Sequence, residues 1–223
     1  MNIFWFRRDL RLDDNAGLFL ALQQIEGVLP IFIFDTSILN QLPKDDARVS
    51  FIHEQLENIQ RQLSSIGKSL AVFYGTPNEV FEKITTEQNI TAVYTNTDYE
   101  PYARKRDLDL YQLFKAKNID FITCKDQVIF EKNEVTKDDG LPYVVYTPYS
   151  KKWKECFKNT PLTFYASEKY VHKIAAHGYP FLSLHDIGFE KSKIAVTPFD
   201  VSENLIHNYE ATRNFPALNK TSY

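Results

Sequence analysis

Short apolar runs alternate with helical patterns of apolar residues from the N-terminus to about residue 123. The runs have the length of buried strands, and the segments between them have helical spacing. Because consecutive parallel strands need a crossover connection, this alternation predicts an α/β fold with a doubly wound, five-stranded parallel sheet and helices on both faces. The predicted strands are Asn2–Phe6, Ile31–Phe34, Ser69–Tyr74, Thr91–Thr95 and Ile119–Thr123.

The helical pattern between the second and third strands is the clearest. Its apolar residues recur at spacings of three and four, which places them on one helix face. These residues are Val49, Ile52, Leu56, Ile59, Leu63 and Ile66. Gly67 is expected to end this helix, because glycine readily adopts the left-handed conformation found at helix C-termini.

Capping residues predict where other helices begin. Asp13 or Asp14 is the expected N-cap of the first helix. The buried side of this helix would carry Leu18, Leu22 and Ile25. The stretch Thr76–Glu79 has the sequence of a capping box with proline at the first helical position. A further helix is expected from about Tyr99 to Lys117.

The alternating pattern ends near residue 124. Val128–Glu131 and Tyr143–Tyr146 flank the turn-forming cluster Lys137–Gly140, which predicts a β-hairpin. Thr147–Lys158 can form a short helix. Periodicity is then lost from about residue 159 to 198, and so long an irregular stretch is typical of a functional segment or a linker. A new helical pattern covers Ser202–Arg213.

Composition narrows the class of protein. Of the 223 residues, 43% are hydrophobic and only 7 are glycine, which indicates a globular protein with a buried core. The net charge of −3 gives no general sign of nucleic-acid binding. Cys124 and Cys156 match no metal or redox spacing and are expected to be reduced thiols. No apolar stretch approaches the ~20 residues that cross a bilayer, so no membrane association and a cytoplasmic location are expected.

A charged cluster follows the first predicted strand. Residues 7–15 read Arg-Arg-Asp-Leu-Arg-Leu-Asp-Asp-Asn and lie at a carboxyl strand end, where α/β proteins bind ligands. No glycine precedes Gly17, so the usual glycine-rich phosphate turn of a dinucleotide site is missing. The alternative is a solvated ladder, in which the three arginines pair with Asp9, Asp13 and Asp14 and contribute little.

A second cluster, Asn96–Asp107, follows the fourth predicted strand. If the first and fourth strands are neighbours, both clusters rim one crevice at the point where strand order reverses. The alternative is an ordinary helix N-terminus, because acids in a first turn are favourable for the helix dipole alone. Near the C-terminus, Thr221 and Ser222 could begin another helix, whose amides and hydroxyls can hold a phosphate.

Taken together, these clusters resemble the photolyase/cryptochrome family. Trp5–Asn15 is similar to the family's opening signature almost position for position, and Pro30–Asp35 to its second strand. Asp98–Tyr102 with Arg106 and Asp107 resembles its fourth-strand motif. The remaining matches are Tyr146–Tyr149 and Trp153, near the end of the α/β domain, and Tyr209 with Arg213–Pro216, at the entry to the helical domain.

The resemblance implies a specific function. Photolyases use blue light and FAD to split pyrimidine dimers in DNA, and their N-terminal α/β domain holds a second, light-harvesting chromophore. Tyr209, Thr221 and Ser222 match residues that contact FAD. The rest of the FAD site is absent from this sequence, so the chain by itself is expected to be inactive.

The same resemblance divides the chain into four parts. Residues 1–130 are the antenna-chromophore domain, and residues 131–158 complete it with a hairpin and a short helix. Residues 159–200 are a linker between domains. Residues 201–223 begin the FAD-binding helical domain, which is truncated here.

The antenna chromophore implied by the resemblance is a deazaflavin or flavin in preference to a folate. Where folate-binding relatives have asparagine and glutamate, this chain has Tyr102 and Ala103, and Pro43 stands near the place of a folate-contacting histidine. The residues expected to line the crevice are Phe34, Asp35, Arg48, Phe51, Asp98 and Glu100. Arg48 and Phe51 could equally be ordinary first-turn helix residues.

Two alternative functions remain open at the level of sequence. A cryptochrome would use the same architecture for light signalling. A generic nucleotide-binding α/β module is disfavoured, because no serine- or glycine-rich phosphate loop follows the first strand. The expected partner of the leading hypothesis is DNA that contains pyrimidine dimers, and the expected oligomeric state is a monomer.

Overall fold

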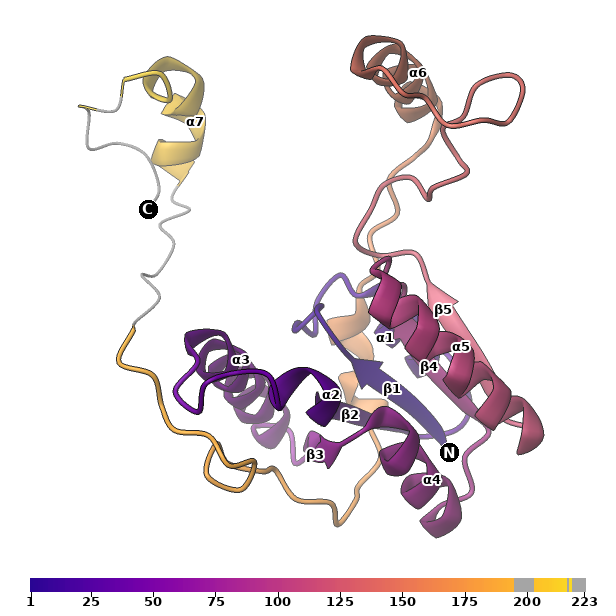
Figure 1. Cartoon of the computed structure of the whole chain (residues 1–223), viewed down its shortest axis with the longest axis vertical. Helices are drawn as coiled ribbons and strands as arrows, with labels where there is room; N and C mark the ends of the chain where they lie inside the picture. The colour runs from indigo at the N-terminus through magenta and orange to yellow at the C-terminus, as the bar shows by residue number, and fades with distance from the viewer. Residues whose placement is uncertain (195–202, 216, 218–223) are drawn as a thin grey trace.

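The computed structural model describes residues 1–194, 203–215 and 217. A five-stranded sheet forms its centre, with strand order β3-β2-β1-β4-β5 (Figure 1). Every neighbouring pair of strands is parallel. The strands are β1 Asn2–Phe6, β2 Val28–Asp35, β3 Ala71–Gly75, β4 Ala92–Asn96 and β5 Asp120–Cys124. The predicted parallel α/β class is confirmed.

The strand order explains where a ligand can bind. The chain adds β2 and β3 on one side of β1, then crosses back to place β4 and β5 on the other side. Since β1 and β4 are neighbours, their carboxyl ends open a crevice at the point of reversal. The adjacency on which the expected crevice depends is therefore present.

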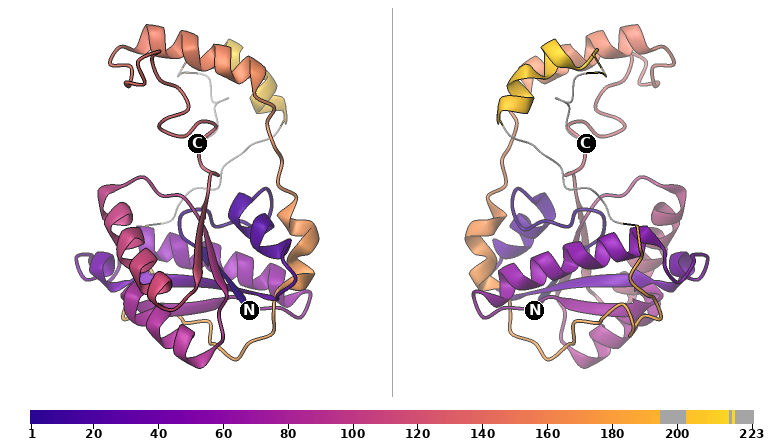
Figure 2. Two further views of the ribbon diagram at one scale, coloured as in Figure 1. Left: turned by 90° about the vertical axis from the view of Figure 1, so that its right-hand side faces the viewer. Right: turned by 90° about the vertical axis from the view of Figure 1, so that its left-hand side faces the viewer.

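Helices cover both faces of the sheet, and the alternation of side chains along β1 divides the core in two (Figure 2). Phe4 and Phe6 pack on the face covered by α1 and α3, whereas Ile3 and Trp5 pack on the face covered by α4 and α5. The helices are α1 Ala16–Leu22, α3 Ala47–Ser64, α4 Pro77–Glu87 and α5 Pro101–Ala116. All five residues of β1 are buried, as a central parallel strand requires.

Most helix boundaries follow from local chemistry. The capping box at Thr76 is present, with Glu79 bonded back to the Thr76 backbone. Gly67 follows α3 with a positive φ of 71°. The predicted start of α1 is wrong, because its N-cap is Asn15, whose side chain accepts a hydrogen bond from the Leu18 amide. Ile25 lies beyond the end of α1 and is fully exposed.

The predicted hairpin after β5 is wrong. Its turn exists, because the Lys137 amide donates to the Leu141 carbonyl at 2.9 Å, but the segments 128–131 and 143–146 form no strands. Val144 and Val145 are exposed, so the apolar residues of this segment have no core to face. The short helix is present as α6 Tyr146–Asn159, which stands away from the sheet (Figure 1).

Residues 160–194, which we call the strap, run along the α/β unit rather than away from it (Figure 1). The strap contains the 3-10 helix η1 Ser167–Lys173. Its backbone bonds to the sheet, with the Ala175 amide donating to the Val28 carbonyl at 2.8 Å. The helix expected over residues 202–213 is present as α7 Glu203–Thr212.

Candidate functional site

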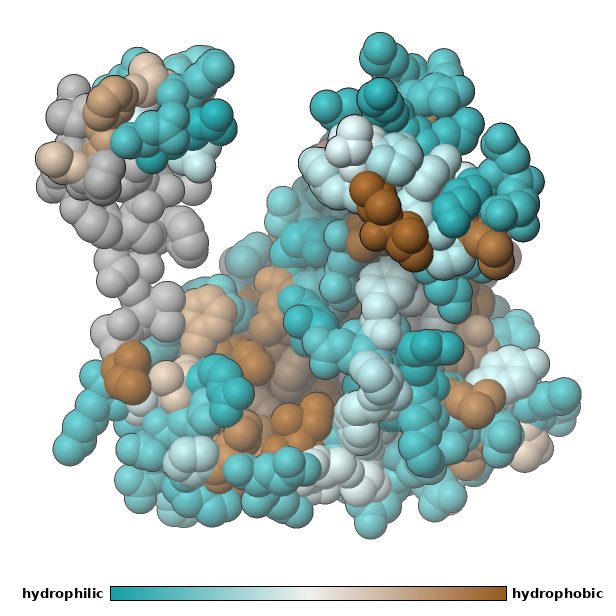
Figure 3. Space-filling view, turned by 45° about the horizontal axis from the view of Figure 1, so that its top comes forward, coloured by the Kyte–Doolittle hydropathy of each residue, from teal (hydrophilic) through white to brown (hydrophobic). Residues whose placement is uncertain are grey.

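A cavity of about 290 Å³ opens at the carboxyl ends of β1 and β2, beside the first turns of α5. Small-molecule sites usually enclose roughly 300–1,000 Å³, so this cavity lies at the lower limit of that range, which suits a compact ligand. Figure 3 shows a hollowed area with apolar residues below a more hydrophilic rim. We call the cavity of about 290 Å³ the switch-point cavity.

One wall of the switch-point cavity is apolar and comes from β2 and the two helices after it. Phe32 and Phe34 of β2 line this wall. The short helix α2 Thr36–Leu39 and the start of α3 complete it. The helical residues concerned are Ile38, Leu39, Val49 and Ile52. A wall of this kind excludes water and binds through apolar contact area.

The opposite wall is aromatic and charged, and α5 supplies most of it. Tyr102, Ala103 and Arg106 lie here beside Trp5 of β1. The Tyr102 hydroxyl donates a hydrogen bond to the Asp35 carboxylate, which joins the two walls. Burial, followed by this hydrogen bond, raises the pKa of the Tyr102 phenol, so Tyr102 stays protonated and acts as a donor.

Two guanidinium groups lie over the ring of Trp5. The central carbon of Arg7 is 5.0 Å from the centre of the indole ring, and that of Arg106 is 4.8 Å from it. Both arginines pair with Asp107, at 2.7 Å from Arg7 Nη1 and 3.0 Å from Arg106 Nη2. Nε of Arg7 is buried and has no hydrogen-bond acceptor among the described residues. Burial lowers the pKa of the Arg7 guanidinium, and Asp107 opposes that shift.

Arg8 forms the exposed rim of the cavity. It pairs with Glu100 at 2.8 Å and lies 3.7 Å from Asp98. More than half of the Arg8 side chain is exposed to solvent, so these pairs contribute little to stability and remain available to a ligand.

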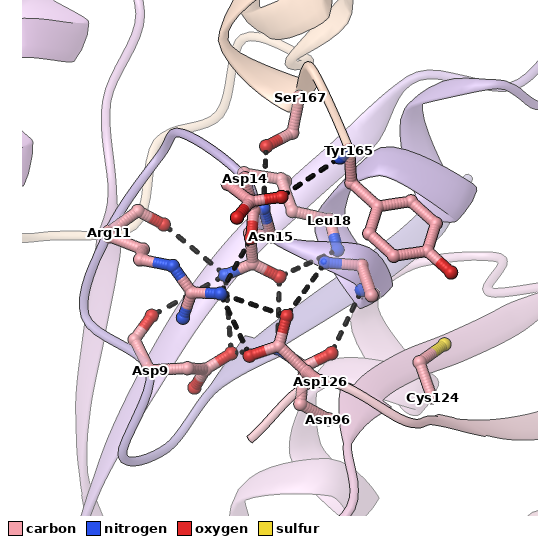
Figure 4. A network of polar contacts seen from close by, with 12 residues as sticks. Asp9, Arg11, Asp14, Asn15, Leu18, Asn96, Cys124, Asp126, Tyr165 and Ser167 are labelled. Carbon is pink, nitrogen blue, oxygen red and sulfur yellow. Dashed lines mark hydrogen bonds and ion pairs between the residues drawn. The ribbon is translucent and has the colours of Figure 1, made fainter. Parts of the chain in front are cut away.

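The rest of the opening cluster builds a buried clamp around the start of α1 (Figure 4). The Asn96 side chain accepts from the Gly17 amide at 2.8 Å and donates to Asn15 Oδ1 at 2.9 Å, and it also donates to the Asp9 carboxylate. Asp126 accepts from Arg11 and from the Ala16 amide, at 2.9 and 3.0 Å. The clamp fixes the loop that presents Arg7 and Arg8 to the cavity.

The alternative interpretation of the opening cluster, in which its three arginines pair with Asp9, Asp13 and Asp14, is wrong. Arg7, Arg8 and Arg11 pair with Asp107, Glu100 and Asp126, which lie about a hundred residues away in the chain. These long-range pairs join the β1–α1 loop to α5, to its N-cap Glu100 and to the segment after β5. Nothing in the local sequence could have identified them, because they depend on strand order.

The structure brings together four of the six residues expected at the crevice. Phe34, Asp35, Asp98 and Glu100 line the switch-point cavity. Arg48 lies outside it, paired with Asp46 at 2.7 Å. Phe51 also lies outside, at a separate hollow beside the strap, and is 41% exposed.

The helical periodicity of α3 explains that difference. Positions 49 and 52 face the cavity, and positions 48 and 51 turn away from it. Val49 and Ile52 were already part of the predicted apolar stripe, which was the signal that could have selected them. Tyr209 is half exposed on α7, and Thr221 and Ser222 lie outside the described residues.

No group of three or more His, Cys, Asp or Glu residues in 1–194, 203–215 and 217 could hold a metal ion. Over the same ranges, no helix is long and apolar enough to cross a membrane.

The structure is a parallel α/β domain with a cavity at the carboxyl ends of its strands, and sequence comparison gives its family. The DNA photolyase family model matches residues 2–167. The chain belongs to the DNA photolyase family. It is 30% identical to a deoxyribodipyrimidine photo-lyase of Synechococcus over 99% of this chain and 49% of the relative. An uncharacterised 31.6 kDa Synechococcus protein is also 30% identical, over 97% of this chain and 80% of the relative.

Solved photolyase structures share this fold. A bacterial class III photolyase from Agrobacterium tumefaciens superposes with a TM-score of 0.79 over 99% of this chain and 48% of its own, at 23% identity. An archaeal photolyase from Sulfolobus tokodaii gives a TM-score of 0.60 at 28% identity, over 74% of this chain and 37% of its own. The chain spans about half the length of the curated photolyases it matches, and it corresponds to their N-terminal domain.

Proposed function

We propose that the chain is the light-harvesting domain of a deoxyribodipyrimidine photolyase and that its switch-point cavity holds an antenna chromophore. The observation that carries this proposal is the cavity itself, which combines an apolar wall, an aromatic wall and a charged rim at the point where strand order reverses. Phe34 and Trp5 bring aromatic side chains to the cavity lining, where a flat ligand can pack against them. Asp35, Arg8 and Glu100 offer polar groups that fix its orientation.

The chromophore would supply light absorption and pass its excitation energy to FAD in the helical domain of the longer protein. The chain's residues bind the chromophore, orient it and keep water away from it. The apolar groups of β2, α2 and α3 exclude water, and the hydrogen bond from Tyr102 to Asp35 fixes the distance between the walls.

We infer a flavin or deazaflavin in preference to a folate. Ala103 is buried at the cavity wall and places a methyl group where folate-binding relatives have a carboxylate. The Sulfolobus tokodaii photolyase, 28% identical to this chain, is described as containing two FAD molecules with the implication of a novel light-harvesting cofactor. That precedent supports a flavin-type ring in this cavity.

The activity proposed for the longer protein is the blue-light-driven, FAD-dependent splitting of pyrimidine dimers in DNA. Tyr209, Thr221 and Ser222 are proposed FAD contacts of the adjoining domain. The chain alone is then expected to leave dimers intact. The relatives named deoxyribodipyrimidine photo-lyase support this activity.

A cryptochrome-type photoreceptor is the second candidate, favoured by 30% identity to Cryptochrome-1 of Aedes aegypti over 65% of this chain. Illumination of the longer protein with dimer-containing DNA separates the two functions. A photolyase restores the dimers to monomers under blue light, whereas a signalling cryptochrome binds flavin and leaves them intact.

Binding to the 223-residue chain tests the antenna proposal. Riboflavin, a deazaflavin and a methenyl-folate are each titrated into the chain and followed by equilibrium dialysis. We expect binding of the flavin-type ligands, with affinity lost in Ala103→Trp, which fills the cavity. Failure of all three ligands to bind would contradict the proposal.

Two exposed arginines provide a matched pair of variants for this titration. Arg8 lies at the cavity rim and Arg48 lies outside the cavity. Arg8→Ala should weaken binding by about threefold to tenfold, the value of one exposed polar contact. Arg48→Ala should leave the affinity unchanged, and equal effects of the two variants would place the ligand elsewhere.

We also propose a cytoplasmic monomer. Both Cys124 and Cys156 are free thiols, which fits a reducing compartment. Light scattering on the purified chain checks the oligomeric state, and cell fractionation checks the location.

A further inference from the structure

Trp5 is the only tryptophan that lines the switch-point cavity. It is 2% exposed, and its ring meets Phe81 edge to face at a centroid distance of 5.2 Å on the side of the sheet core. Its position fixes the indole at the wall that a bound ring would touch. The chain's other tryptophan, Trp153, lies on α6, outside this cavity.

An indole beside a light-harvesting ligand can quench its excited state. An excited flavin-type ring is a strong one-electron oxidant, and an adjacent indole can reduce it. One electron leaves the π system of Trp5 and enters the excited ring, with no bond broken and no proton moved. The electron then returns and the excitation is lost as heat. A light-harvesting ligand beside an unprotected indole would therefore transfer little energy.

The charges around Trp5 oppose this electron transfer. Arg7 and Arg106 lie within about 5 Å of the ring centre, and Asp107 is the carboxylate that pairs with both. The charges of Arg7, Arg106 and Asp107 add up to a net charge of +1 beside the indole ring. Loss of an electron would create a second cation there, in a buried site where charges interact more strongly than in water.

The other charged groups of the cavity have hydrogen-bond or ion-pair partners of their own. Arg8 is held between Asp98 and Glu100, in ion pairs of its own at the exposed rim. Water screens the exposed groups of Arg8 and Glu100, whereas the side chains of Arg7, Arg106 and Asp98 are only 5%, 10% and 11% exposed. Asp35, which is also buried, accepts a hydrogen bond from Tyr102, and Asp98 lies 3.7 Å from Arg8. The charged groups that lie over the Trp5 ring are the two guanidinium groups.

We propose that Arg7 and Arg106 raise the oxidation potential of Trp5 and so prevent it from quenching an excited aromatic ligand in the switch-point cavity. Arg7 and Arg106 act as positioning residues whose charge protects the excited state. The inference rests on the proposed function, because it needs a light-absorbing ligand to protect. The effect of Arg7 and Arg106 on the oxidation potential of Trp5 needs no ligand.

The first test needs no ligand. In a Trp153→Phe background Trp5 is the sole tryptophan, and its potential can be measured by voltammetry of the 223-residue chain. Arg106→Gln removes one charge and leaves Asp107 with its two hydrogen bonds from Arg7, at 2.7 and 2.8 Å. We expect Trp5 to become easier to oxidise in Arg106→Gln, whereas Arg106→Lys, which keeps the charge, should retain most of the original potential.

The second test uses riboflavin as the probe. In Arg106→Gln the fluorescence lifetime of bound riboflavin should fall by about threefold or more, because the charge that opposes electron transfer is lost. Adding Trp5→Phe to Arg106→Gln should restore the lifetime, because the electron donor is then absent. A purely structural role for Arg106 predicts no such rescue.

The outcomes separate this inference from the proposed function. An unchanged Trp5 potential in Arg106→Gln overturns the inference, and so does a lifetime that stays short in the double variant. If riboflavin does not bind, the flavin assignment fails, and the voltammetric comparison alone decides whether the arginines control Trp5.

Discussion

Asn96 holds together the loop on which the candidate site depends. It ends β4, and its amide group bonds to Asp9, Asn15 and Gly17, which all belong to the β1–α1 segment. Each of these groups is buried, so a lost bond would leave an unpaired polar atom at a cost of about 1–3 kcal/mol. The opening signature therefore has two functions: Arg7 and Arg8 face the cavity, and Asp9, Arg11 and Asn15 fix the backbone behind them.

Gly17→Ala should destabilise the chain even though alanine favours helices. A Cβ at position 17 would lie 2.7 Å from Asn96 Oδ1 and 2.9 Å from Phe4. Asn96 cannot move without breaking its hydrogen bonds, so overpacking of about 1–3 kcal/mol outweighs a gain of up to about 1 kcal/mol in helix propensity. Chemical denaturation should show a net loss of up to about 2 kcal/mol.

Gly178→Ala is the matched control for this prediction. A Cβ at position 178 meets nothing within 4 Å, so the same substitution should change the free energy of unfolding by less than about 0.5 kcal/mol. Equal losses in the two variants would show that the clash with Asn96 is not the cause.

At the scale of elements, the sequence predicts what local chemistry decides and fails where a distant partner decides. The apolar stripe of α3 and the capping box of α4 are readable because their signals lie within the helix itself. The start of α1 is misjudged because Asp14 adopts a left-handed φ of 45° and its carboxylate bonds to the Tyr165 amide of the strap. The hairpin fails because Val144 and Val145 have no sheet to join.

The same distinction applies to the candidate site. Phe34, Asp35, Asp98 and Glu100 can be selected because each ends or follows a predicted strand, and parallel strands end at one edge. Arg106 is harder to select from the sequence, because its contact with Trp5 depends on how α5 packs across the sheet. Arg48, selected as a lining residue, is instead the partner of the residue that caps α3.

Asp46→Ala should weaken α3 and the cavity wall that its first turns form. Asp46 is the N-cap, and its carboxylate accepts from the Arg48 amide at 2.9 Å. Loss of such a cap costs about 1 kcal/mol, whereas Asp45→Ala, at the exposed neighbouring position, should cost almost nothing. Thermal unfolding of both variants against the original chain measures the difference.

This contribution should depend on pH in a defined direction. The hydrogen bond with Arg48 lowers the pKa of the Asp46 carboxyl to about 2, below its ordinary value of 3.8. A depressed pKa stabilises the folded chain above pH 3.8, and the contribution is lost as pH falls through about 2. The stability gap between the original chain and Asp46→Ala should therefore narrow over this range, and a gap that stays constant would contradict the assignment.

At the scale of the whole molecule, the strap joins the loops and helices of the α/β unit into one body. Ala175 of the strap bonds to β2, and the Pro180 carbonyl accepts a hydrogen bond from the Val72 amide of β3. The Leu182 carbonyl lies 3.0 Å from Nε2 of His53, which belongs to α3. Backbone groups make many of these bonds, so the strap needs no regular pattern of side chains. That is why its sequence is typical of a linker although it packs like part of a core.

Removal of the strap should therefore unfold the α/β unit. Ile174, Ile187 and Phe189 are each no more than 3% exposed and belong to the same apolar cluster as Phe4 and Phe34. Burial of three such side chains contributes about 5–9 kcal/mol, which is comparable to the whole stability of an ordinary domain at about 5–15 kcal/mol. A chain of residues 1–158 should lack a cooperative thermal transition, whereas a chain of residues 1–194 should melt close to the original temperature. If residues 1–158 melted cooperatively at that temperature, the strap would be a linker after all, and the α/β unit would end where its regular sequence pattern ends.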